Sequence, residues 1–201
     1  MASRKDAREY SKRRKPVYAL ILEGRNKTEK MYFGHFISRN APYILKLISA
    51  EDTDPLGMAK KADETRRKFE MRPENGDKAF CLIDVDLSHV RMNQIESAKK
   101  KYQNISFVLS NPCFEIWLLY YFTEYPAVVG SSQKVKDELK RFVSNYTENM
   151  DVIAEYKLQD CYAVAINRAE KRQANPDAES IVDRNPYTEV PELVMLLTRS
   201  C

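Results

Sequence analysis

The stretch that decides the fold is AFCLIDVD, residues 79–86. Five uncharged residues run without interruption into Asp84 and Asp86, which are separated by a single residue. An apolar run of this length is typical of a strand buried on both faces of a sheet, so we expect the two carboxylates at its carboxyl end. In an extended chain Asp84 and Asp86 point to the same side, which suits joint coordination of a hard cation such as Mg²⁺. The alternative is that the pair only caps a turn.

A second apolar run, residues 17–22, ends in Glu23 and predicts another buried strand with a carboxylate at its carboxyl end. After a loop, apolar residues with helical spacing begin at Met31, so this segment is a strand–loop–helix unit. Asn26 is a candidate helix cap, and Glu29, three residues later, completes a capping box. A structural role for Glu29 is therefore as well founded as a functional one.

Two further strands, residues 44–48 and 105–109, alternate with helical segments. Such alternation is typical of a parallel sheet that is covered on both faces. We therefore predict an α/β fold with a mostly parallel four-stranded sheet flanked by helices, followed by a helical C-terminal lobe. The expected helices cover residues 55–71, 91–101, 112–123, 132–146, 151–156, 158–173 and 187–199. Ser110 or Asn111 is expected to cap the helix over 112–123, with Pro112 in its first turn.

Three parts of the chain follow from this pattern: a basic arm over residues 1–15, the α/β domain over 16–126, and the helical lobe over 127–201. The arm holds seven basic side chains against two acidic ones, a net charge of +5. Because the whole chain carries +4, the remainder carries −1. The arm, with Arg13 and Arg14 at its end, is either a phosphate-binding element or a solvated tail.

Composition narrows the class of protein. The chain is 43% hydrophobic and 31% charged, values typical of a globular protein rather than a disordered one. No apolar run approaches the ~18 residues that span a bilayer, and no signal peptide precedes residue 16, so we expect a cytoplasmic protein without membrane contact. The four cysteines are widely spaced and indicate no zinc site. Neither a phosphate-binding loop for ATP nor a DNA-recognition helix is present in the sequence.

Acidic residues end two of the expected strands, Glu23 on one and Asp84 and Asp86 on another, and Glu115 begins the helix after a third. A parallel sheet brings its carboxyl strand ends to one edge, so these carboxylates should converge. Carboxylates without obvious basic partners repel one another and raise one another's pKa unless a cation is bound. Mg²⁺ or Mn²⁺, held by carboxylates and water, would resolve the repulsion and support phosphodiester hydrolysis.

Three motifs carry a resemblance to a known family. They are LILEGxxxTExxYF (residues 20–33), SNPCFEIWLL (110–119) and NPxTEV (185–190), and they resemble the RloB-like family over about residues 15–198. The Glu-Gly and Asp-x-Asp pattern also resembles the TOPRIM domain of topoisomerases, primases and OLD-type nucleases. Residues 84–89 depart from the family's Asp-Arg-Asp-Asp-His pattern at Val85 and Leu87, which puts substrate contacts at these two positions in doubt.

The resemblance implies a TOPRIM-like component of a bacterial anti-phage, abortive-infection system, often encoded beside an ATPase of the AAA or ABC type. It implies a metal-dependent nuclease acting on DNA or RNA, in which Glu23 is a general acid/base or metal ligand. Asp84 and Asp86 would hold Mg²⁺. Glu29 and Glu115 match family motifs and become further candidate ligands. A homo-oligomer is also possible for such a partnered protein.

Candidate nucleic-acid contacts come from loops near these carboxylates. Arg25 and Lys27 follow the first strand, and His89 follows the Asp-x-Asp pair, so each could contact phosphate. Solvated loop side chains explain the same residues. Glu115 could simply favour a helix N-terminus through the macrodipole. Two rival functions stay open: a catalytically silent binding module that regulates an ATPase, and a primase-like phosphoryl-transfer enzyme.

Overall fold

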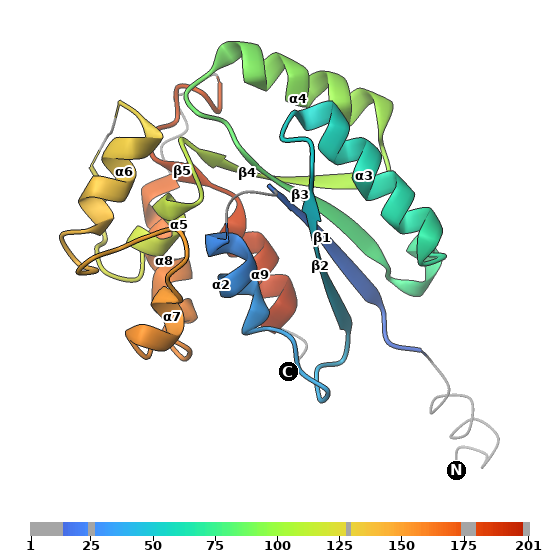
Figure 1. Ribbon diagram of the computed structural model, residues 1–201, viewed down its shortest axis with the longest axis horizontal. Helices are drawn as coiled ribbons and strands as arrows, with labels where there is room; N and C mark the ends of the chain where they lie inside the picture. Colours follow the sequence, from blue (N-terminus) through green and yellow to red (C-terminus); the bar gives the residue numbers. More distant parts are fainter. Residues whose placement is uncertain (1–13, 24–26, 128–129, 174–179, 199–201) are drawn as a thin grey trace.

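The computed structural model describes residues 14–23, 27–127, 130–173 and 180–198. A five-stranded sheet with the order β2-β1-β3-β4-β5 lies at its centre, and helices cover both faces (Figure 1). The predicted α/β class with a helix-flanked, mostly parallel sheet is confirmed. The strands are β1 (Val17–Glu23), β2 (Ile44–Ala50), β3 (Lys78–Asp84), β4 (Ile105–Asn111) and β5 (Tyr187–Thr188). The helices are α2 (Thr28–Gly34), α3 (Pro55–Lys68), the 3₁₀ turn η1 (Pro73–Asn75), α4 (His89–Lys101), α5 (Glu115–Leu119), α6 (Ser132–Leu139), α7 (Val152–Glu155), α8 (Tyr162–Gln173) and α9 (Val190–Thr198).

The sheet has one strand more than predicted. The four expected strands are parallel, and β5 pairs antiparallel with the end of β4 through Ser110 and Asn111. The sequence predicted a helix from residue 187, but α9 begins only at Val190. A strand of two residues is too short to produce an alternating pattern, which is why the sequence does not reveal it.

Strand β1 is buried on both faces, as its uninterrupted apolar sequence predicts. Val17, Ala19 and Ile21 point to the face covered by α3 and α4, and the intervening residues point to the opposite face. Figure 1 shows α3 and α4 on one side of the sheet and α2, α5 and α9 on the other. The sheet therefore lies between two layers of helices.

Three helix predictions need correction. The helix expected over 112–123 is the short α5, because β4 continues to Asn111 and α5 begins only at Glu115. Pro112 therefore does not lie in the first turn of a helix. The helix expected over 132–146 ends at Leu139, and the one expected from 158 begins at Tyr162.

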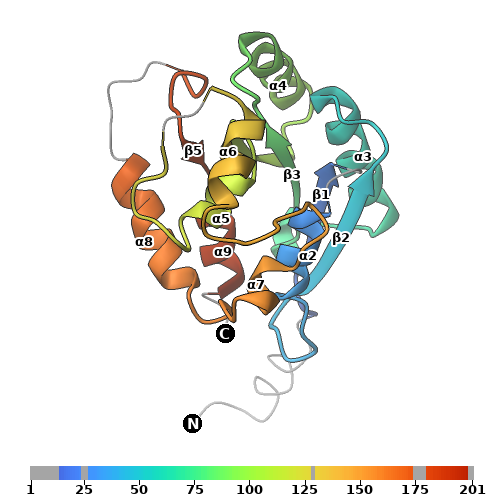
Figure 2. The same ribbon diagram turned by 60° about the vertical axis from the view of Figure 1, so that its left-hand side comes forward.

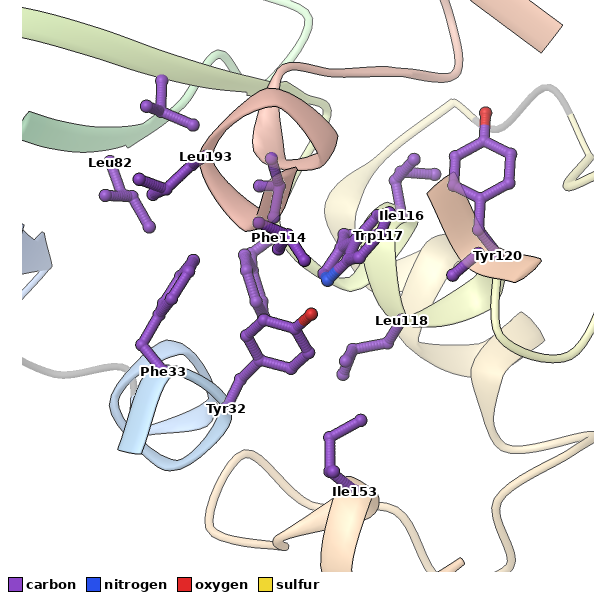
Figure 3. Packing of buried hydrophobic residues seen from close by; sticks show 14 of the residues in the cluster. Tyr32, Phe33, Leu82, Phe114, Ile116, Trp117, Leu118, Tyr120, Ile153 and Leu193 are labelled. Carbon is purple, nitrogen blue, oxygen red and sulfur yellow. The ribbon is translucent and has the colours of Figure 1, made fainter. Parts of the chain in front are cut away.

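One hydrophobic core joins the sheet to the helices beyond residue 127. It contains Leu82 of β3 together with Trp117, Val135 and Leu193. Figure 3 shows Tyr32 and other aromatic rings of this core packed between α2, α5 and α9, and Figure 2 shows α6, α7 and α8 around α5. The division of the chain at residue 126 stays a prediction, since the core continues across it. None of the helices in the described ranges is long and apolar enough to cross a membrane.

Candidate metal centre

The candidate site lies where the order of the strands reverses. From β1 the chain continues to β2 on one side, and then returns to β3 on the other side of β1. The loops after β1 and β3 therefore diverge, and ligands of open α/β sheets bind in the resulting crevice at the carboxyl ends of the strands. Glu23 is the last residue of β1 and Asp84 is the last residue of β3.

Asp84 lies at the centre of a group of five carboxylates. It shares a face of β3 with Phe80 and Leu82, the face on which α2 and α5 pack. Burial raises the pKa of Asp84 well above its ordinary value, and four neighbouring carboxylates raise it further. In order of effect, these neighbours are Glu29, Glu115, Glu23 and Asp86. The electrostatic neighbours of Asp84 are thus the four other acidic residues that the sequence proposed as metal ligands.

Two of these carboxylates are buried with an oxygen atom that has no hydrogen-bond partner. Glu29 on α2 is 2% exposed and Glu115 on α5 is fully buried, yet Oε2 of each is unpartnered within the described part of the chain. Burial raises the pKa of Glu29 well above its ordinary value, and the charges of Glu23 and Glu115 add to the effect. Buried charges in proteins are normally paired or bound to a metal. A bound cation would supply a partner for these two oxygens.

The other oxygen of Glu115 is held by residues from beyond α5. The Tyr146 hydroxyl donates a 2.9 Å hydrogen bond to Glu115 Oε1, and it lies 3.2 Å from Thr28 Oγ1. Lys136 Nζ lies 3.9 Å from the same Oε1 and also forms an ion pair with Glu148. Tyr146 and Lys136 thus orient Glu115 through one oxygen, and the other oxygen is the one without a hydrogen-bond partner.

Arg91, in the first turn of α4, is the main functional residue that the sequence reasoning missed. Its guanidinium donates hydrogen bonds to the Glu23 carboxylate, to the Asp84 carbonyl oxygen and, at 3.2 Å, to the Thr53 carbonyl oxygen. Arg91 Nε also lies 3.9 Å from Asp86 Oδ2. The expectation that the carboxylates lack basic partners was therefore wrong. A basic residue five positions after an Asp-x-Asp motif was the signal available in the sequence.

Glu23 combines burial with this ion pair. Burial raises the pKa of Glu23 above its ordinary value, Arg91 lowers it, and Asp86 raises it again, so that the net direction is upward. A carboxyl group with a raised pKa at the end of a strand is suited to proton transfer.

Asp86 is oriented differently from the sequence prediction. β3 ends at Asp84, and both Asp86 (φ 55°) and Leu87 (φ 56°) adopt the left-handed conformation. The extended chain that would have pointed Asp84 and Asp86 to the same side therefore does not continue to Asp86. Its carboxylate is exposed and accepts a 2.7 Å hydrogen bond from Ser132 Oγ on α6. Two consecutive left-handed residues without glycine cost about 1–2 kcal/mol each, so other contacts must hold this turn.

Asn111 supplies those contacts. Its Oδ1 accepts a 3.0 Å hydrogen bond from the Leu87 backbone N–H, and its Nδ2 donates to the carbonyl oxygens of Ile181, Val182 and Arg184 at 2.9–3.0 Å. The prediction that Asn111 or Ser110 caps the following helix was wrong. Asn111 instead ties the turn after β3 to the segment that leads into β5.

The sequence of this chain was compared with models of known protein families. A family model described as RloB-like protein matches residues 18–197. The chain belongs to the RloB-like family. The matched range includes all five carboxylates and Arg91. Searches of curated proteins and of solved structures found no significant match.

The remaining predicted contacts of this RloB-like chain are more scattered. Lys27 is exposed at the N-cap of α2, and His89 is exposed at the first position of α4, near the site. Arg14 pairs with Asp77, which precedes β3 and so lies at the opposite edge of the sheet. Arg13, Arg25 and the proposed cap Asn26 lie outside the described residues. The N-cap of α2 is Lys27, and Glu29 points into the acidic cluster.

The donor set fits a hard divalent cation. Carboxylate oxygens are the protein ligands that Mg²⁺ prefers, and Mg²⁺ usually retains several waters and binds one or two carboxylates directly. Accordingly, the absence of any ready-made group of three acidic, histidine or cysteine ligands among the described residues does not conflict with Mg²⁺. The unpartnered oxygens of Glu29 and Glu115 and the half-buried Asp84 carboxylate are the groups that would hold it.

Proposed function

We propose that this RloB-like protein is a Mg²⁺-dependent nuclease. The observation that carries the proposal is the convergence of five carboxylates, two with unpartnered buried oxygens, at the switch point of a parallel sheet. Arg91 and Lys136 are the cations paired with these carboxylates among the described residues, and a divalent ion would remove most of the repulsion that arises when all five carboxylates ionise. Such a cluster is typical of sites that process phosphate groups with bound metal.

Each carboxylate has a role that its surroundings support. Asp84, Glu29 and Glu115 are the metal-holding groups, because Glu29 and Glu115 are almost completely buried with an unpartnered oxygen and Asp84 has four carboxylate neighbours. Bound Mg²⁺ would lower the pKa of a water molecule and neutralise charge on the scissile phosphate. Glu23, whose pKa is raised, is suited to carry a proton to or from the reacting groups. Asp86, exposed at the rim, would orient water.

Three side chains keep these groups in place. Tyr146 and Lys136 hold Glu115 from the helical lobe, and Arg91 holds Glu23 while bonding the backbone of Asp84. Partners that orient metal ligands typically change metal affinity 10–100-fold when they are removed. The proposed activity therefore depends on both the α/β part and the helices that follow it.

The substrate we propose is DNA or RNA, and the biological role we propose is that of an effector in bacterial anti-phage defence, together with an ATPase partner. These finer statements rest on the family resemblance. The exposed Lys27 and His89, both near the acidic edge, support contact with a phosphate backbone.

One observation favours a second candidate, a catalytically silent module that regulates an ATPase. Arg91 already supplies a positive charge to Glu23 and contacts the Asp84 backbone, so part of the cluster is neutralised without metal. In this case Arg91 would replace the metal permanently, and the protein would associate with its partner in EDTA as well as in Mg²⁺.

A cleavage assay separates the two. Purified protein is incubated with labelled DNA and with total tRNA, in Mg²⁺, in Mn²⁺ and in EDTA, with and without the neighbouring ATPase. The nuclease proposal predicts metal-dependent cleavage products that disappear with Asp84→Asn. The products should persist with the control Glu74→Gln, which changes an exposed carboxylate on η1. Cleavage that survives in Asp84→Asn, or an absence of cleavage under every condition, would reject it.

A further inference from the structure

A cavity lies near the last turn of α2, and none of the five carboxylates lines it. Its volume is about 380 Å³, and it is lined by residues of α2, the loop over residues 35–43, α7, the α7–α8 connection and the end of α9, and it opens to solvent. Figure 2 shows α2, α7 and α9 grouped on this side of the molecule. Small-molecule sites in proteins commonly have volumes of about 300–1,000 Å³, so this cavity has the size of a ligand site.

The lining is aromatic and carries no acidic or strongly basic side chain. Five aromatic side chains contribute to it: Tyr32, Phe36, Tyr43, Tyr121 and Tyr162. No Asp, Glu, Lys or Arg belongs to the described residues that line it. The only imidazole, that of His35, is already bonded to Asp151 at 2.9 Å. A phosphate, carboxylate or ammonium group would lose its hydration here without an opposite charge in return, which disfavours charged ligands.

One pair of hydroxyl groups in the lining could orient a bound ligand. The hydroxyl groups of Tyr32 and Tyr121 lie 2.8 Å apart and share a hydrogen bond, and both rings are almost completely buried. One hydroxyl group of the pair donates its hydrogen to the other. The accepting hydroxyl keeps its own hydrogen, which can be donated to an acceptor on a ligand. The rings themselves are locked by neighbours: Tyr32 packs edge-on against Trp117, and Tyr121 does the same. The pair therefore offers hydroxyl groups on fixed rings among the residues that line the cavity.

We propose that this cavity binds a small, neutral, flat aromatic molecule with one hydrogen-bond acceptor directed at the Tyr32–Tyr121 pair. Aromatic walls favour a planar ring through stacked and edge-to-face contacts. The volume accommodates a bicyclic ring, and the uncharged lining excludes nucleotides and other phosphates.

This site is separate from the candidate metal centre. Glu29 lies among the carboxylates, and Tyr32, about one helical turn further along the same helix, lines the cavity, so the two sites lie one after the other along α2. None of the five carboxylates lines the cavity. The inference consequently stands whether or not the chain is a nuclease.

The test uses quinoline as the probe, because it is bicyclic, neutral near pH 7.5 and has one acceptor nitrogen. Quinoline-4-carboxylate is the charged control and naphthalene lacks the acceptor. Binding to the full chain is followed by saturation-transfer NMR and calorimetry. We expect quinoline to bind, the carboxylate to bind at least about tenfold more weakly, and naphthalene to bind about two- to tenfold more weakly than quinoline.

Two variants locate the binding. Ala41 is buried at the cavity wall, so Ala41→Phe fills the cavity and should abolish quinoline binding, whereas Val90→Phe adds the same bulk on the exposed outside of α4 and should not. Tyr121→Phe keeps the ring but removes a hydroxyl, so it should weaken the binding of quinoline about two- to tenfold and leave the binding of naphthalene unchanged. If Ala41→Phe does not fold, the result with Tyr121→Phe decides whether the cavity is the binding site. Failure of quinoline to bind the wild-type chain, equal binding by the carboxylate, or binding unaffected in Tyr121→Phe would overturn the proposal.

Discussion

Replacing Arg91 with methionine removes the main cation of the acidic cluster while keeping much of the side-chain volume. The substitution deletes the ion pair with Glu23 and the hydrogen bonds to the carbonyl oxygens of Asp84 and Thr53. It also removes a weaker attraction to Asp86 at 3.9 Å. What remains is a cluster of carboxylates whose mutual repulsion is less compensated.

The size of the effect follows from the exposure of the pair. The Arg91 and Glu23 side chains are 19% and 20% exposed, so the pair is neither a solvated surface pair nor a fully buried one. Breaking a buried pair costs about 3–5 kcal/mol, and a single hydrogen bond to a charged group contributes about 1.5–3 kcal/mol. We therefore expect a loss of about 2–3 kcal/mol in the free energy of unfolding without metal. For a chain of this size that corresponds to about 4–12 °C in melting temperature.

Urea denaturation in EDTA at pH 7.5 measures this loss directly. Saturating Mg²⁺ should narrow the gap between Arg91→Met and the wild type, because a bound cation replaces the missing charge. Arg91→Lys is the matched control, and it should recover part of the stability, since it keeps the charge but cannot reach all three acceptors. A variant within about 0.5 kcal/mol of the wild type in EDTA would refute the view that Arg91 compensates this cluster.

Three further predictions concern the same edge of the sheet. Burial and neighbouring charges raise the pKa values of Glu29 and Asp84, so their contribution to stability is fully present below the ordinary carboxyl pKa and is lost as pH rises through the raised values. Urea titrations in EDTA should accordingly show stability falling with increasing pH, and Asp84→Asn should flatten that dependence; an unchanged slope would contradict the assignment. Tyr146→Phe removes the hydrogen bond that orients Glu115 and should weaken Mg²⁺ binding about 10–100-fold in calorimetry, so an unaltered affinity would exclude a positioning role. Asn111→Ala leaves the Leu87 N–H and three carbonyl oxygens without their partner and should cost about 2–4 kcal/mol in urea denaturation, and a loss below about 1 kcal/mol would show that the turn is held by other contacts.

Apolar runs were sufficient to predict the four parallel strands. β1 and the interior of β3 are buried and read as unbroken hydrophobic segments, whereas β2 and β4 are partly exposed and contain polar residues. The same logic brought Glu23 and Asp84 to one edge, since parallel strands end together. Local patterns were less reliable around Pro112. The sequence there is typical of a capped helix, yet β4 continues to Asn111 and α5 starts only at Glu115.

Residues that complete the site from distant segments were not predictable from local sequence. Ser132, Lys136 and Tyr146 lie in a region with no motif. The packing of α6 against α5 places Ser132 beside Asp86 and Lys136 beside Glu115, and the segment after α6 places Tyr146 beside Glu115. Asn111 was identified through a family motif but given the wrong role, because its partners lie about 70 residues away along the chain. Such contacts depend on tertiary structure, which hydrophobic periodicity does not encode.

The most direct test of the central claim is calorimetric titration of the protein with Mg²⁺ and Mn²⁺. We predict saturable binding to the wild-type chain and a loss of at least about 100-fold in affinity with Asp84→Asn. The control Glu74→Gln, which removes an exposed carboxylate outside the cluster, should leave the affinity unchanged. An absence of binding to the wild type, or equal affinity in Asp84→Asn, would contradict the assignment of these five carboxylates as a metal centre.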